Sequence, residues 1–359
     1  MRCLFVSLAL AAALHSAPTM ADQDLWRLEA RTVPFDDTSP AQTIDYAPIE
    51  QASQPWRLCV LYPHLKDAYW LSVNFGMREE AVRLGVGFDV FEAGGYPNVA
   101  RQREQLKVCQ SKEFDAVILG TVSYDQLSPE VERIARDKPV IAAVNDIEDS
   151  GITAKASVPW YDMGAAAGRF IAERHPTEST KVTVAWFPGP KGAGWVRFVE
   201  AGFRDAIAGS SADIIATRFG DTGLEQQVLL VEEVLDEFPD VDYLVGSGPM
   251  AEAAVSLLRA RGLAGKVQIV STYLSHGVFR GLMRGRILAA PTDSPVMQGR
   301  LAVEMAVRAI EGKLETLHAG PKIDVLEPER LADFEMQDSL APASFVPLFS
   351  LAAKPVQDH

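Results

Sequence analysis

The sequence predicts an α/β protein in which two doubly wound lobes, each built on a parallel sheet, are joined by a hinge. From Trp56 onward, short apolar runs alternate with amphipathic segments, which is the pattern typical of βαβ units. The pattern restarts near Trp160, and a chain of 359 residues has room for about two domains. Residues 291–295 combine two prolines with small polar residues, which favours a crossing between the lobes there.

The first residues predict an export signal. Arg2 precedes an apolar run at residues 4–14, and Thr19, Met20 and Ala21 offer a cleavage site. The run is shorter than a membrane span, and no later stretch reaches the roughly 18 uninterrupted apolar residues that a span needs. We therefore expect residues 1–21 to be a signal peptide and the mature chain to lie in the periplasm, without direct insertion into a membrane.

Residues 22–55 have a different character. They are polar, are interrupted by four prolines and carry scattered apolar anchors such as Trp26 and Tyr46. This composition predicts an N-terminal arm that lies over the surface or is offered to a partner.

The first series of alternating segments begins at Trp56. Its expected strands and helices, in chain order, are 58–62, 67–84, 88–91, 99–110, 116–119, 125–136 and 140–144. The strands are short apolar runs and the helices carry an apolar face. Asp67 fits the N-cap of the first helix, and Gly85 fits its C-terminal end.

The second series follows Trp160. Its expected elements are helices at 163–174, 196–208, 226–238, 251–261 and 275–285, and strands at 182–187, 214–218, 243–245, 267–271 and 287–290. A further helix, 297–311, comes after the crossing. We therefore assign residues 56–159 and 292–320 to an N-terminal lobe, and residues 160–291 and 321–359 to a C-terminal lobe and its tail.

Cys59 and Cys109 are expected to form a disulfide, because two thiols in an exported protein commonly pair. In a doubly wound sheet of order 2-1-3-4-5, the second helix crosses over the first strand. Cys59 lies in that strand and Cys109 late in that helix. Closing a loop of 109 − 59 = 50 residues would stabilise the fold by ~4 kcal/mol in the chain-entropy model. The alternative is two buried free thiols.

Charge and motifs exclude several classes of function. The formal net charge of −14 argues against a nucleic-acid surface or an anionic membrane as partner. Walker, His-Glu-x-x-His, Gly-x-Ser-x-Gly and Cys-x-x-Cys motifs are absent, and the six histidines are isolated from one another. The glycine-rich residues 188–194 match no phosphate-binding pattern and predict a tight loop beside the crevice. We therefore expect no enzyme activity, no metal and no cofactor.

Aromatic residues follow the ends of several predicted strands. They are Tyr69 with Trp70, Tyr96, Trp160 with Tyr161, and Tyr273. Because an open α/β sheet places its ligand crevice at this edge, we expect these rings to form an aromatic cage. Such a cage suits a small methylated, cation-like ligand. Trp186, inside a strand, and Trp195, which opens a helix, are expected to be core or subsite-filling residues and not ligand contacts.

Several short blocks carry a family resemblance. They are LKDAYWLS at 65–72, NFGM at 74–77, EAGGY at 92–96, VPW at 158–160, YLSH at 273–276 and RGL at 280–282. With them, the chain from about Trp56 to Gly312 resembles the TorT family of periplasmic trimethylamine N-oxide (TMAO) sensors. More broadly, it is similar to the type I, ribose-binding-like periplasmic binding proteins. The usual sugar-clamping Asp and Arg positions of that broader group are not evident.

The resemblance implies a ligand, a partner and a set of ligand contacts. It implies a co-sensor that binds TMAO and signals through the periplasmic sensor domain of a TorS-like membrane histidine kinase, which induces TMAO respiration. The implied ligand contacts are Tyr69, Trp70, Tyr96, Trp160 and Tyr273. Asp67 is expected first as the helix N-cap and second as a ligand contact, because a carboxylate would favour a true cation over a zwitterion.

Two other functions stay open at this point. The same architecture would serve a periplasmic solute-binding protein for a sugar or a quaternary amine, feeding an ABC transporter or a quorum-sensing kinase. An exported α/β enzyme would use Asp67 or Asp146 as a base, and the missing catalytic motifs disfavour it.

Overall fold

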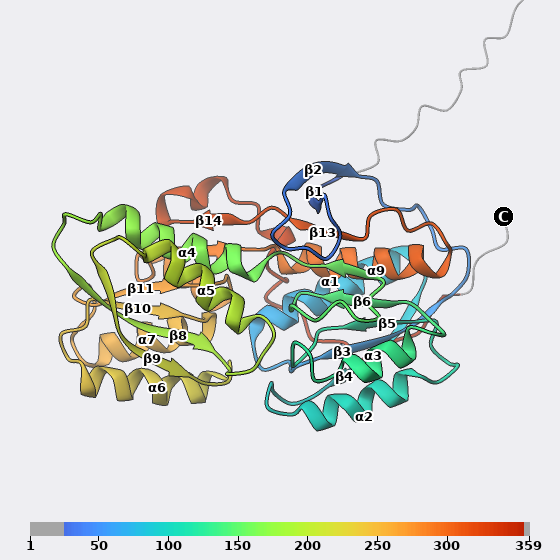
Figure 1. The fold of residues 1–359 in the computed structure, drawn as a ribbon, viewed down its shortest axis with the longest axis horizontal. Helices are drawn as coiled ribbons and strands as arrows, with labels where there is room; N and C mark the ends of the chain where they lie inside the picture. The colour runs from blue at the N-terminus through green and yellow to red at the C-terminus, as the bar shows by residue number, and fades with distance from the viewer. Residues whose placement is uncertain (1–24, 355–359) are drawn as a thin grey trace, which may run out of the picture.

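The computed structural model describes residues 25–354, in which two α/β lobes lie side by side along the longest axis (Figure 1). The expected fold class is confirmed, because parallel strands alternate with helices in both lobes. The signal peptide expected at residues 1–21 lies outside the described residues. Within them, no helix is long and apolar enough to cross a membrane.

The N-terminal lobe is built on a sheet of nine strands in the described chain, in the order β15-β4-β3-β5-β6-β7-β13-β1-β2. Its central strands are β4 (Gly87–Glu92), β3 (Arg57–Tyr62), β5 (Ala116–Leu119), β6 (Val140–Ala143) and β7 (Ala154–Ala156). They pair in parallel and in the expected 2-1-3-4-5 order. Buried apolar residues dominate these strands because helices cover both faces of the sheet.

Helices cover both faces of this sheet (Figure 1). On one side lie α1 (Ala68–Leu84) and α9 (Pro295–Ile310), which pack on each other. On the other lie α2 (Val99–Cys109) and α3 (Ser128–Ile134). The expected caps of the first helix are confirmed: Asp67 accepts a hydrogen bond from the Tyr69 amide, and Gly85 takes a left-handed conformation with φ 77°.

The expected disulfide is present. Cys59 in β3 and Cys109 at the end of α2 are joined, with their Cα atoms 5.6 Å apart. Both side chains are fully buried, so the bond ties α2 onto the centre of the sheet.

The C-terminal lobe has a smaller sheet of four parallel strands in the order β11-β10-β8-β9. Their bounds are β11 (Gln268–Ser271), β10 (Tyr243–Gly246), β8 (Val182–Gly189) and β9 (Ala212–Phe219). One face is covered by α4 (Trp160–Arg174) and α5 (Val196–Ile207), and the other by α6 (Leu224–Glu237) and α7 (Gly248–Ala260) (Figure 1). The short α8 (His276–Met283) packs beside α7.

Residues 22–55, expected as an arm, are in large part a β-hairpin. Strands β1 (Trp26–Arg31) and β2 (Ala41–Tyr46) pair antiparallel, and β1 also pairs with β13 (His318–Pro321). Trp26 and Leu28 are buried, which explains why the segment joins the sheet instead of lying over it. Four prolines and a polar composition concealed this period-two pattern.

The C-terminal tail contacts both lobes. Strand β14 (Asp324–Leu326) pairs with β12 (Ala290–Thr292) beside the C-terminal lobe. The two 3-10 helices follow, η1 (Pro328–Asp333) and η2 (Met336–Asp338). The chain then returns to the N-terminal lobe, where β15 (Ser350–Leu351) pairs antiparallel with β4. Because β4 would otherwise be an unpaired sheet edge, the tail's last described residues cover it.

Candidate functional site

A small cavity lies between the two lobes, beyond the carboxyl ends of β3 and β6. Its lining residues are Asp67, Tyr69, Trp70, Tyr96, Asn145, Trp160, Trp195, Thr222 and Tyr273. The set includes all six residues that the sequence analysis named as ligand contacts. The cavity volume is only about 10 Å³, close to the room that one water molecule occupies.

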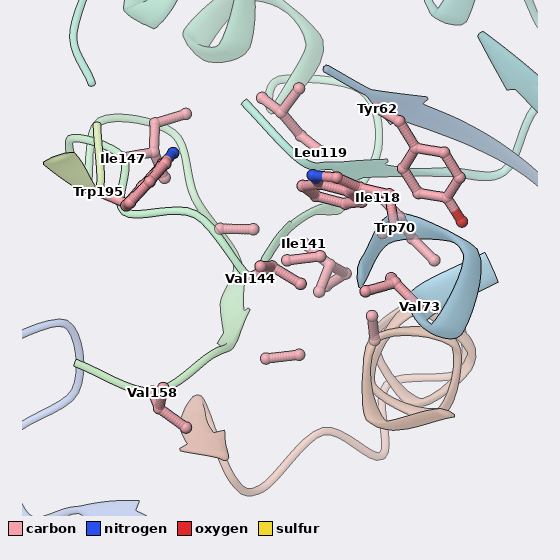
Figure 2. Close-up of a cluster of buried hydrophobic side chains, with 14 of the residues drawn as sticks. Tyr62, Trp70, Val73, Ile118, Leu119, Ile141, Val144, Ile147, Val158 and Trp195 are labelled. Atoms are coloured by element: carbon pink, nitrogen blue, oxygen red, sulfur yellow. The ribbon is translucent and has the colours of Figure 1, made fainter. Parts of the chain in front are cut away.

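The N-terminal lobe contributes its rings from the first turn of α1. Asp67 caps this helix, so the next residues, Tyr69 and Trp70, face the interlobe space from a rigid helix start. Trp70 packs against Tyr62 with ring centroids 5.1 Å apart, and Figure 2 shows both beside Leu119. Gly120 is required here, because a Cβ atom at that position would lie 2.4 Å from the Trp70 ring.

The C-terminal lobe contributes Trp160, Trp195 and Tyr273. Helix α4 begins at Trp160, three residues earlier than expected, directly after Pro159, which is its N-cap in an extended conformation. Trp195 ends the glycine-rich loop after β8, where the left-handed Gly189 leaves room for its ring. Tyr273 follows β11, so each ring comes after a strand end.

Rings from the two lobes are in direct contact. Tyr69 of the N-terminal lobe lies edge-on to Tyr273 with centroids 5.3 Å apart and lies 6.4 Å from Trp160. Within the C-terminal lobe, Trp160 lies 4.8 Å from Trp195. Tyr96 contacts Trp195 at 6.1 Å. Edge-to-face and tilted contacts at these distances are the favourable geometries for aromatic pairs. The rings therefore form one continuous cluster that spans the lobes.

Two buried carboxyl groups hold the tyrosines of the cage. The Tyr273 hydroxyl donates to Asp67 Oδ2 at 2.6 Å, and the Tyr69 hydroxyl donates to Asp293 Oδ2 at 2.6 Å. Burial raises the pKa of Asp67 to about 6, although its hydrogen bonds oppose the shift. Burial also raises the pKa of Asp293. With its pKa at about 6, Asp67 is mainly charged at pH 7 and places negative potential next to the rings.

Hydrogen-bond donors converge near the Tyr96 hydroxyl. Asn145 Nδ2 donates to it at 3.1 Å, and the indoles of Trp70 and Trp195 lie close by. Trp195 Nε1 is buried and makes no hydrogen bond of normal geometry within the described chain. In contrast, Trp160 Nε1 is already committed to the Val144 carbonyl at 2.9 Å. The part of the cavity near Tyr96 can therefore donate hydrogen bonds to an acceptor atom of a ligand.

Polar contacts join the lobes next to the cage. His64 Nε2 lies 2.9 Å from the Thr222 hydroxyl, and Lys66 Nζ lies 4.0 Å from Asp221. Burial lowers the pKa of His64 to about 4, so its ring is neutral at pH 7. With the Tyr273–Asp67 hydrogen bond, these contacts hold the lobes together over the cavity.

The structure separates the other aromatic candidates. Tyr161, next to Trp160, is exposed and donates a hydrogen bond to Asp205 instead of lining the cavity. Trp186 is a core residue as expected, stacked on Phe203 at 4.1 Å. Trp195, not expected as a ligand contact, lines the cavity. Like the other rings, Trp195 follows the end of a strand, and this position could have indicated its role. The glycine-rich loop between that strand and Trp195 concealed the pattern.

Asn145, Thr222 and Asp293 were missed, because polar residues after strands are common and give no aromatic signal. Asp146, the alternative enzyme base, is buried and does not line the cavity. Among residues 25–354, no group of three His, Cys, Asp or Glu side chains could hold a metal ion.

Comparisons with known proteins agree with this architecture. Residues 58–314 match the family model described as a periplasmic binding protein domain. The chain is 39% identical over 301 residues to the periplasmic protein TorT of Escherichia coli K12, covering 83% of this chain and 86% of that protein.

Two solved structures are similar over most of the chain. The first is an ABC transporter solute-binding protein from Bradyrhizobium sp. BTAi1 with bound Bis-Tris, at 44% identity and a TM-score of 0.78, covering 92% of this chain and all of that one. The second is TorT in complex with the TorS sensor domain in the presence of TMAO, at 40% identity and a TM-score of 0.75, covering 82% and 99%.

Proposed function

The chain belongs to the periplasmic binding protein family, and from that premise we propose that it is a periplasmic sensor that binds TMAO between its lobes and reports it to a membrane histidine kinase. The observation that carries the proposal is the cluster of rings from both lobes around one cavity with a buried carboxyl group. The relative at 39% identity is TorT, and the solved structure at 40% identity is TorT in complex with the TorS sensor domain.

The methyl end of the ligand fits the rings. TMAO presents three methyl groups that carry diffuse positive charge, and each Tyr or Trp face attracts such a group by ~0.5 to 2 kcal/mol. Asp67 adds a counter-charge, while none of the nine lining residues is Lys, Arg or His. We assign this end to Tyr69, Trp160 and Tyr273, which cluster around Asp67.

The oxygen end of the ligand needs hydrogen-bond donors. The N-oxide oxygen is a strong acceptor, and the Trp195 indole N–H is buried without a well-aligned partner within the described chain. The Tyr96 hydroxyl lies beside it. We assign these two groups, with the Trp70 indole, to the oxygen.

The size of the cavity favours a compact ligand. A volume of about 10 Å³ is far below the ~300 Å³ or more of ordinary small-molecule sites, so the rings must part to admit even five heavy atoms. A sugar would require a larger rearrangement, and six of the nine lining residues are aromatic. Binding therefore couples ligand entry to opening and closure of the lobes.

Calorimetry with purified mature protein tests the proposal. TMAO should give saturable heat without product formation, whereas tert-butanol, which has the same shape without the N-oxide charge separation, should bind at least tenfold more weakly. Ribose should give no heat. Absence of saturable heat with TMAO would show that TMAO is not the ligand.

A transporter role is the second candidate, because the solute-binding protein from Bradyrhizobium is 44% identical. The two roles differ in the partner. A sensor should form a complex with the periplasmic domain of its kinase that survives gel filtration, and a transporter component should not. We propose the sensor because TorT, at 39% identity, has a solved relative in complex with the TorS sensor domain, and because aromatic rings predominate in the lining of the cavity.

A further inference from the structure

Three polar residues from the sequence blocks that carry the family resemblance do not belong to the ligand cage. They are Ser72, Asn74 and His276, and none of them is among the residues that line the cavity. Ser72 and Asn74 lie on α1 and are buried, and His276 is the first residue of α8. All three bind the backbone of the C-terminal tail between η2 and β15.

The backbone of Ala341 is held by both lobes. Its amide donates to Ser72 Oγ at 3.2 Å, and His276 Nε2 donates to its carbonyl at 2.7 Å. Because a carbonyl oxygen only accepts, Nε2 of His276 carries the ring proton. Ser72 belongs to the N-terminal lobe and His276 to the C-terminal lobe, and Ala341 itself is buried. The two backbone groups of this one residue therefore join the lobes.

The two segments that Ala341 joins also carry two rings of the cage. Tyr69 lies on α1, three residues before Ser72, and Tyr273 lies three residues before His276. The two rings are in edge-on contact across the lobes, with centroids 5.3 Å apart. Ala341 thus connects the segments whose approach brings these rings together.

The two ends of this stretch of tail are fixed in different lobes. Leu340 is buried in the hydrophobic core of the C-terminal lobe. Leu348 is bound to α1 through both of its backbone groups, since its amide donates to Asn74 Oδ1 at 2.9 Å and its carbonyl accepts from Asn74 Nδ2 at 3.1 Å. Between them, Phe345 lies edge-on to Phe75 of α1 at 5.1 Å. The tail therefore crosses from one lobe to the other just after Leu340.

The tail also contacts the connection from β12 to α9. Ser339 Oγ lies 2.9 Å from Thr292 Oγ1 and donates to Ser294 Oγ at 3.4 Å. Ser294 has a φ of 49°, which is uncommon for a residue other than glycine. Such a conformation needs support from surrounding contacts, and Ser339 supplies part of it.

We propose that residues 339–348 form a strap that favours the closed arrangement of the lobes and so raises ligand affinity, with Ser72 and His276 as its positioning residues. When the lobes part, α1 and α8 separate. Because Leu340 moves with the C-terminal lobe, Ala341 then loses its hydrogen bond to Ser72. The open state lacks this bond, so the closed state is favoured. This inference rests on the proposed binding of TMAO.

Calorimetry with the mature protein tests the strap through two substitutions and their combination. Ser72→Ala and His276→Ala should each weaken TMAO binding at least threefold, since one hydrogen bond changes an equilibrium about two- to tenfold. The double variant should lose less than the product of the two single losses, because Ala341 no longer joins the lobes once either bond is gone. Arg280→Ala truncates an exposed side chain on α8 and should stay within twofold of wild type.

A conservative variant separates positioning from general damage. In His276→Gln the amide can donate to the Ala341 carbonyl, so TMAO affinity should return to within twofold of wild type. Small-angle X-ray scattering gives a second readout. Ligand-free His276→Ala should have a larger radius of gyration than ligand-free wild type, and saturating TMAO should bring both to the same value. A damaged fold would not close again.

Three results would each overturn the proposal. They are wild-type affinity in both alanine variants, a double loss equal to the product of the single losses, and failure of His276→Gln to restore affinity. If wild type binds no TMAO, the proposed function fails, and the ligand-free radius of gyration alone decides the role of the strap.

Discussion

At the scale of single residues, Trp160 joins the two lobes most directly. Its ring contacts Tyr69, Trp195 and Tyr273, and its indole N–H crosses to the Val144 carbonyl. It is 3% exposed, so nearly all of its surface is used in contacts.

We expect Trp160→Ala to weaken TMAO binding at least tenfold, because it removes one aromatic face and the hydrogen bond that orients it. Tyr161→Ala is the matched control, since it truncates the neighbouring, exposed ring on the same helix. Calorimetry measures both. An unchanged affinity for Trp160→Ala would remove this residue from the cage.

The raised pKa of Asp67 predicts how the affinity for TMAO depends on pH. With its pKa at about 6, the carboxyl is mainly charged at pH 7 and mainly neutral at pH 5. TMAO affinity should therefore fall at least threefold from pH 7 to pH 5, as the counter-charge to the methyl end is lost. Asp67→Asn, which keeps an N-cap side chain, should remove this dependence. Calorimetry at both pH values that showed the same fall in the variant would contradict the assignment.

The same shift affects folding in the opposite direction. The folded protein holds its proton on Asp67 more tightly than the unfolded chain, whose carboxyl has a pKa of 3.8. The contribution of this group to stability is therefore present below pH 4 and is lost as the pH rises through about 6. The charged form of Asp67 at neutral pH therefore lowers the stability of the fold, and the same charge is the one that attracts the methyl end of the ligand.

At the scale of elements, the disulfide fixes α2 to β3 but lies away from the cage. Removing it with Cys59→Ala and Cys109→Ala should lower the free energy of unfolding by ~4 kcal/mol, as expected for closing a loop of this length. Denaturant unfolding measures the loss. TMAO affinity of the folded double variant should match wild type, and a large loss of affinity would show that α2 positions the site.

At the scale of the whole molecule, closure of the lobes changes the surface that a partner protein would contact. The cavity is too small to admit a ligand while the lobes are joined, so the ligand-free protein must sample an open state. TMAO should favour the closed state only through contacts that the open state lacks.

Small-angle X-ray scattering should show a smaller radius of gyration with saturating TMAO than without it. Thr222→Val, which removes the interlobe hydrogen bond to His64, should need a higher TMAO concentration for the same change. Thr43→Val, on exposed β2, is the control. Identical scattering with and without TMAO would contradict ligand-driven closure.

The sequence by itself determined the fold class, the strand order of the first sheet and most of the cage. Period and capping signals place α1 and its Asp67 cap, and parallel strands necessarily present their carboxyl ends at one edge. Aromatic residues that follow strand ends must therefore meet there. The same topology brought Cys59 to Cys109.

The tertiary structure decided the rest, because those features depend on contacts between segments distant in sequence. Strands β1 and β15 form only because the sheet offers them an edge, and their own residues give little β signal. Trp195 enters the cage because Gly194 can pack on the Asp146 carbonyl. Tyr273 meets Asp67 across more than two hundred residues, so no local pattern could pair them.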